Sequence, residues 1–158
     1  MAEQRGASEL SLVCRVAPHL CALPVKQVAE TMRSLPIEPL AGMPKFILGL
    51  SIIRGEPVPV VDVGRLLQDA DRAAAPARFA TIKVGDRRAA LAVDEVIGVR
   101  AIDTGSLTGL PPLLRDARSD VVAAIGLLDA QLLLVLDGLR IVPEALWTEM
   151  AAREGALR

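Results

Sequence analysis

Short apolar segments, separated by turn residues and charged residues, follow one another along most of the chain. Some are apolar at every position, notably residues 58–61 and 132–136. Apolar runs of this length are typical of β-strands that are covered on both faces. The glycines, prolines and polar residues between them indicate hairpins. The pattern therefore predicts an all-β protein.

The pattern of the first half returns in the second half. Residues 22–28 match residues 90–96, and residues 58–65 match residues 133–140. Each half reads as an early hairpin, a variable middle and a late hairpin that ends in an aspartate, Asp62 or Asp137. Four hairpins in a chain of this length favour strands closed into small barrels.

The chain after the last hairpin predicts a short terminal α-helix. Pro143 suits the first position of a helix, and Leu146, Trp147, Met150 and Ala151 fall on one face. We interpret this helix as a lid over the core, with a helix that docks on a partner as the alternative. The helix and tail cover residues 144–158.

Composition and charge narrow the function. Hydrophobic residues make up 52% of the chain, which is enough to build a substantial interior, and the formal net charge is −1. This balance argues against nucleic-acid binding, which needs an excess of clustered cations. The longest apolar runs fall far short of the ~20 residues of a spanning helix, and the first residues lack a signal-peptide core. We expect a cytoplasmic protein without direct membrane insertion.

The sequence shows no catalytic, cofactor-binding or metal-binding constellation. His19 lies in a predicted turn, and the spacing of Cys14 and Cys21 matches no common metal framework. We expect buried thiols rather than a disulfide, although the register of neighbouring strands decides whether they face each other. Asp62 and Asp137 recur at equivalent strand ends, which favours a structural role in accepting backbone N–H groups.

The stretch FILGLSIIRGEPVPVVDV carries Arg54 and Gly55 at the predicted tip of a late hairpin. Its prolines, Pro57 and Pro59, confine their strand to a sheet edge or to irregular pairing. The equivalent residues of the second half are aspartate and alanine, at 129–130, so the hairpin itself does not require arginine and glycine. Arginine is enriched in interfaces and fits carboxylates. We interpret Arg54 as a partner contact; the alternative is a solvated turn residue.

This stretch resembles the signature of CheW-like domains, the coupling proteins of bacterial chemosensory arrays. The segments LCALPVKQVAETMR, LPIEPLAGMPKF, LAVDEVIGV and VVAAIGLLDAQLLLVLD are similar to other parts of the family pattern. The resemblance covers residues 8–143 as a single domain. It implies two intertwined five-stranded SH3-like barrels around a shared core, which agrees with the repeat. We expect sub-barrels at about residues 12–68 and 78–142, divided by a linker at 69–78.

The resemblance also implies a function. Family members are non-enzymatic adaptors that bind the regulatory domain of a CheA-type histidine kinase and the cytoplasmic tip of methyl-accepting chemoreceptors. They are cytoplasmic and are recruited to membrane-associated receptor arrays. The positions that carry over as partner-binding residues are Val28, Glu30, Arg54, Gly55, Val93, Asp94 and Val96.

Two other functions stay open from the sequence. One is a divergent CheW-like module in another signalling or localisation system. The other, from a different class, is a small β-barrel that binds a ligand or acts as an enzyme. The second requires a polar pocket with converging titratable groups.

Overall fold

The computed structural model of the chain describes residues 8–68, 76–108 and 119–157. Most of the linker expected at 69–78 lies outside these residues, as does Arg158 of the tail. The strands are β1 (Ser8–Val16), β2 (His19–Pro24), β3 (Val28–Arg33), β4 (Ile47–Ile53), β5 (Glu56–Asp62), β6 (Arg78–Val84), β7 (Arg87–Val93), β8 (Glu95–Asp103), β9 (Val122–Leu128) and β10 (Gln131–Leu136). The helices are α1 (Val63–Gln68), α2 (Glu144–Leu157) and the 3-10 turns η2 (Val25–Gln27), η3 (Thr104–Ser106), η5 (Ser119–Val121) and η6 (Gly138–Arg140).

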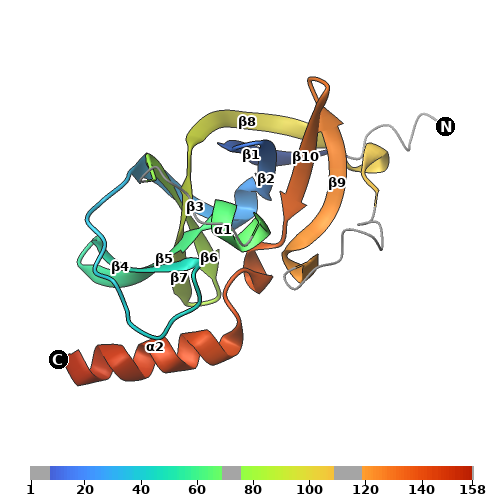
Figure 1. Cartoon of the computed structure of the whole chain (residues 1–158). Helices are drawn as coiled ribbons and strands as arrows, with labels where there is room; N and C mark the ends of the chain where they lie inside the picture. Colours follow the sequence, from blue (N-terminus) through green and yellow to red (C-terminus); the bar gives the residue numbers. More distant parts are fainter. Residues whose placement is uncertain (1–7, 69–75, 109–118, 158) are drawn as a thin grey trace.

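The strands form two five-stranded sheets, which confirms the predicted fold class. Sheet A has the order β8-β1-β2-β10-β9, and sheet B has the order β3-β6-β7-β5-β4. Figure 1 shows sheet A at the upper right, sheet B at the left and α2 below sheet B.

The two sheets do not follow the two halves of the sequence. The early hairpin β1–β2 pairs in parallel with β10, and the early hairpin β6–β7 pairs in parallel with β5. Each half thus gives its early hairpin to the sheet that holds the other half's late hairpin. The sub-barrels expected at about 12–68 and 78–142 are corrected accordingly: each barrel contains strands from both halves.

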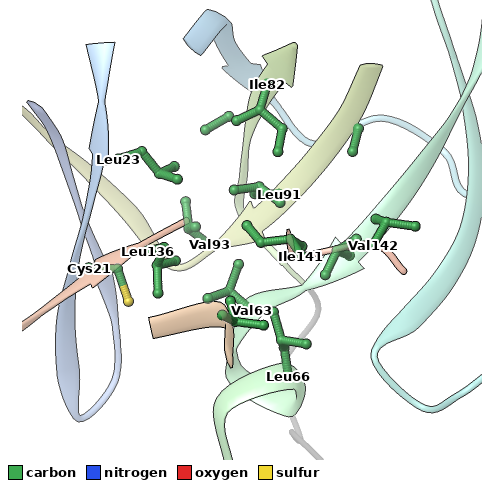
Figure 2. Close-up of a cluster of buried hydrophobic side chains, with 14 of the residues drawn as sticks. Cys21, Leu23, Val63, Leu66, Ile82, Leu91, Val93, Leu136, Ile141 and Val142 are labelled. Carbon is green, nitrogen blue, oxygen red and sulfur yellow. The ribbon is translucent and has the colours of Figure 1, made fainter. Parts of the chain in front are cut away.

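This exchange explains why so many strands are apolar at consecutive positions. In β7, Leu91 and Val93 belong to a core shared by both sheets, whereas Ala90 and Ala92 belong to a smaller core inside sheet B. Sheet A has a corresponding small core that includes Val13 and Leu133. Figure 2 shows the shared core, to which strands of both sheets and α1 contribute. Both faces of the central strands are therefore removed from water.

The prolines of β5 occupy a position that the sequence did not predict fully. β5 is an interior strand between β7 and β4, so of the two predicted alternatives the sheet edge is wrong and irregular pairing holds. Pairing with β7, however, begins only at Val60. Pro57 and Pro59 pair with β4 alone, opposite Ile52 and Leu50. The missing N–H groups therefore fall where β5 lacks its second neighbour.

Helix α2 covers the shared core, in agreement with its interpretation as a lid. Trp147 and Met150 are buried in that core, and Arg87 lies over the Trp147 ring at 4.7 Å from the ring centre. Arg87 also donates two hydrogen bonds to the Glu144 carboxylate, at 3.0 and 2.9 Å. Ala151 was expected on the buried face, but it is exposed. The buried stripe is therefore narrower than the apolar pattern suggested.

Candidate functional site

The hairpin between β4 and β5 turns through two residues with left-handed backbone conformation. Arg54 has φ +51° and Gly55 has φ +80°, as expected for the two-residue turn that matches strand twist. The β9–β10 hairpin has the same conformation at Asp129 (φ +51°) and Ala130 (φ +65°). A turn of this kind is therefore built without arginine and glycine, as the comparison of the two halves predicted.

The side chain of Arg54 pairs with Glu30 across sheet B. Its Nε donates to Glu30 Oε2 at 2.8 Å, and its Nη2 donates to Glu30 Oε1 at 2.8 Å. Glu30 lies on β3 and Arg54 follows β4, and these two strands stand at opposite ends of the sheet order. The ion pair therefore joins the two edges of sheet B. A two-point contact of this kind fixes the orientation of both groups.

The ion pair shifts the ionisation of both partners. Hydrogen bonding from Arg54 lowers the pKa of Glu30, an effect that partial desolvation opposes and the charges of Arg54 and Arg88 reinforce. The same hydrogen bond raises the pKa of Arg54. Most of the Arg54 side chain remains in solvent, with 76% of its surface exposed, against 26% for Glu30. Both groups are therefore charged near neutral pH, and Arg54 is open to a partner.

The position of Glu30 is fixed by a threonine that sequence reasoning missed. The Thr81 hydroxyl on β6 accepts a hydrogen bond from the Glu30 N–H at 3.1 Å and donates to the Glu30 carbonyl at 3.2 Å. These bonds lie at the irregularity in the β3–β6 ladder between Val28 and Glu30. A signal was available, because Thr81 is a hydroxyl within the apolar run of a predicted strand, and a buried hydroxyl needs a partner.

The ion pair lies at a depression of about 200 Å³. Its floor is apolar where Ile53 and Val58 reach the small core of sheet B, and its rim is charged. The lining residues are Glu30, Ile53, Arg54, Glu56, Val58, Thr81 and Arg88. We call this depression the tip pocket. It combines an apolar surface with charged groups of both signs, which suits a protein partner.

The remaining predicted positions lie elsewhere. Val93 is 3% exposed in the shared core, so its assignment to a partner surface is corrected. Val28 and Val96 are half-buried against the same core. Asp94 accepts a hydrogen bond from the Ala17 N–H at 2.8 Å and thereby holds the β1–β2 turn. Partner contact by Val28, Asp94 and Val96 stays a prediction, and none of the three lines the tip pocket.

The two cysteines lie in the protein interior. Cys14 and Cys21 are register partners on β1 and β2, and both are buried free thiols. Burial raises the pKa of each to about 12, so neither forms the reactive thiolate near neutral pH. The expectation of buried thiols is therefore confirmed.

The two strand-end aspartates act as predicted. Asp62 accepts a hydrogen bond from the Arg65 N–H at 3.1 Å, and Asp137 accepts one from the Leu139 N–H at 3.1 Å. Within the described part of the chain, no group of three histidine, cysteine or acidic side chains is placed to hold a metal ion. Nor do the described helices include one long and apolar enough to span a bilayer.

Comparison with known proteins gives a consistent result. A family model described as the CheW-like domain matches residues 11–146. The protein FrzA of Myxococcus xanthus is 33% identical over 107 residues, which cover 67% of this chain and 66% of that protein, just under two thirds of its length. The scaffolding protein TtCheW from Thermoanaerobacter tengcongensis has a similar structure, with a TM-score of 0.74 and 23% identity. That match covers 85% of this chain and 92% of the other, and it supports the two SH3-like barrels.

Proposed function

The chain belongs to the CheW-like domain family, and we propose that it couples chemoreceptors to a CheA-type histidine kinase. Proteins of this family are non-enzymatic scaffolds of chemosensory signalling. In the proposed role, the chain binds the cytoplasmic tip of a methyl-accepting receptor and the regulatory domain of the kinase at the same time. It acts in the cytoplasm and is held at the membrane by its receptors.

The observation that carries this proposal is the exposed Arg54–Glu30 pair at the tip pocket. The turn itself does not require arginine, because Asp129 and Ala130 build the same backbone geometry in the other hairpin. A solvated pair of this kind contributes little to folding. A charged, oriented and exposed arginine beside an apolar floor is instead the composition of a binding surface.

The apolar part of the surface extends beyond the pocket. Ile52, on the edge strand β4, lies two positions before the turn residue Arg54 and is 65% exposed. Its cross-strand neighbour on β5 is Pro57, whose half-buried ring adds a second apolar side chain beside it. A partner can therefore bury Ile52 through side-chain contact, with Arg54 setting the orientation. We expect reversible association through an interface of modest area.

The direct test uses purified proteins from one organism. The chain is titrated with the isolated regulatory domain of its CheA-type kinase and, separately, with a fragment that contains the receptor tip. We expect both to bind, and we expect Arg54→Ala to weaken at least one of them by roughly 1–3 kcal/mol. Asp129→Ala is the matched control, since it alters the equivalent turn of the other hairpin, and its affinity should equal that of the wild type.

Two results would count against the proposal. If the wild-type chain binds neither protein, the role in kinase coupling fails, and a CheW-like module of another system becomes the better account. If the wild type binds both but Arg54→Ala binds equally well, the family role stands and the tip pocket is not its interface.

A further inference from the structure

The tip pocket contains a second arginine that its own chain leaves unengaged. Two of the five N–H donors of Arg54 are held by Glu30. Arg88 lines the same pocket and is exposed, and no hydrogen bond or ion pair within 4 Å joins it to the described residues. Of the two cations at this site, Arg88 therefore has its whole donor set available.

The fold aims Arg88 at the pocket. β7 is the central strand of sheet B, and its residues alternate between the shared core and the small core of that sheet. Ala90 and Ala92 face the small core, so Arg88 continues their row to the mouth of the barrel. Two ladders hold the strand, because β7 pairs with β6 throughout and with β5 from Ala90 onward. The backbone position from which the Arg88 side chain extends is therefore held in place by the sheet.

The charges around the pocket favour one kind of ligand. Glu30 is already engaged by Arg54, and Glu56 is the other acidic residue that lines the pocket. Arg88 has no carboxylate within ion-pair distance among the described residues, although its charge helps to lower the pKa of Glu30. An incoming carboxylate would find open donors at Arg88 and would be repelled by Glu56. That asymmetry fixes the orientation of an acidic partner segment.

We propose that Arg88 binds an acidic side chain of the receptor tip in the tip pocket and thereby contributes to receptor specificity. This inference rests on the proposed function and deepens it. Arg54, held by Glu30, orients the receptor segment against the rim, while Arg88 receives the carboxylate in a two-point contact. The proposal assigns this contact to the receptor alone, so we expect the kinase regulatory domain to dock without it.

The test compares charge reversals at two neighbouring positions. Lys83 is the register partner of Arg88 on β6, and it is exposed but does not line the pocket. Arg88→Glu and Lys83→Glu therefore change the net charge equally on adjacent strands. We expect Arg88→Glu to weaken binding of the receptor fragment at least ~10-fold and Lys83→Glu to change it by less than about twofold. Binding of the kinase regulatory domain should be unchanged in both, and circular dichroism checks that both are folded.

Complementary reversal sharpens the result. Each acidic residue of the receptor fragment is changed to arginine in turn, and the fragments are titrated against Arg88→Glu. The proposal predicts that one of them recovers most of the lost affinity, whereas none recovers it with Lys83→Glu.

The outcomes distinguish failure of the Arg88 proposal from failure of the coupling function. If the wild type binds the receptor and Arg88→Glu binds equally well, the Arg88 proposal is overturned and the coupling function stands. An equal loss of receptor affinity in Lys83→Glu would show that only the net charge of this surface matters. That result would also overturn the Arg88 proposal. If the wild type binds no receptor fragment, both the coupling function and the Arg88 proposal fall.

Discussion

The two late hairpins, β4–β5 and β9–β10, share one backbone turn and differ in what they expose. Both tips place two residues at positive φ, and both carry an exposed apolar residue two positions before the turn. Ile52 is 65% exposed and Leu127 is 74% exposed. At the first tip Arg54 is tied to Glu30 on β3. At the second tip no ion pair joins Asp129 to the rest of the described chain.

The comparison separates what the fold requires from what it does not. Two left-handed residues are required, because the tight turn must match the twist of its strands. The charge is not required, since one tip is basic and the other acidic. A feature that one copy of a repeat has and the other lacks is better explained by a partner than by folding.

The largest expected effect comes from reversing the charge at the first tip. Arg54→Glu places two carboxylates together at the pocket and presents the wrong sign to a partner, so binding should weaken by several kcal/mol, more than in Arg54→Ala. The double variant Arg54→Glu/Glu30→Arg rebuilds the internal pair in the opposite direction. Titration calorimetry with both partners measures the two variants.

The double variant decides which role the arginine has. If Arg54 itself contacts the partner, binding stays weak although the internal pair is restored. Recovery of wild-type affinity would instead show that Arg54 acts only through the ion pair that joins the two edges of sheet B.

Next in size is the comparison of the strand-end aspartates. Asp62 and Asp137 each accept a backbone N–H, but the side chain of Asp62 is 8% exposed and that of Asp137 is 29% exposed. Both substitutions remove an ion-pair partner, that of Arg65 for Asp62 and that of Arg140 for Asp137, but the Arg65 Nε is also buried and has no hydrogen bond. We expect Asp62→Ala to lower the free energy of unfolding by about 2 kcal/mol and Asp137→Ala by about 1 kcal/mol. Urea denaturation measures both, and a larger loss in Asp137→Ala would contradict the argument that burial decides the size of the effect.

Exchanging glycine and alanine between the tips should change the free energy of unfolding by similar amounts and with opposite sign. At positive φ a Cβ is strained, and a Cβ at Gly55 would contact nothing within 4 Å, so only the backbone matters there. Gly55→Ala should destabilise by about 1 kcal/mol, and Ala130→Gly should stabilise by about 1 kcal/mol. Denaturation midpoints test this, and changes of the same sign would show that the two turns are not alike.

The smallest expected effect is on the pH dependence of stability. Because Arg54 lowers the pKa of Glu30 below its ordinary value of 4.5, the stabilisation is fully present above pH 4.5 and is lost as the pH falls through the lowered pKa. Glu30→Gln should remove the part of the loss of stability at low pH that comes from protonation of Glu30. Denaturation midpoints measured from about pH 3 to 6 test this. Glu144→Gln is a matched comparison, since Arg87 lowers the pKa of Glu144 in the same way. An unchanged acid profile in Glu30→Gln would contradict the pair.

Local features of the fold could be predicted from the sequence. The hairpins, the turn at Arg54 and Gly55, and the caps at Asp62 and Asp137 depend on residues close together in the chain. The buried thiols and the lid helix also followed from short patterns. Each of these has a local physical cause, such as turn geometry or a nearby backbone N–H.

Long-range pairing could not be predicted in the same way. The exchange of early hairpins between the sheets depends on parallel pairing of β2 with β10 and of β7 with β5, which leaves no local signal. The same topology buries Val93 and brings Glu30, Thr81 and Arg88 to one pocket. The sequence predicted Glu30 and Arg54 as separate contacts, and only the curvature of sheet B makes them one site.

The most direct measurement exchanges the two tips. Arg54→Asp/Gly55→Ala gives the first hairpin the tip of the second, and Asp129→Arg/Ala130→Gly does the reverse. The affinities of both variants for the kinase regulatory domain and the receptor fragment are compared with the wild type. A partner site at the first tip predicts a large loss of affinity in the first variant and wild-type affinity in the second. Wild-type affinity in the first variant, or equal losses in both, would contradict it.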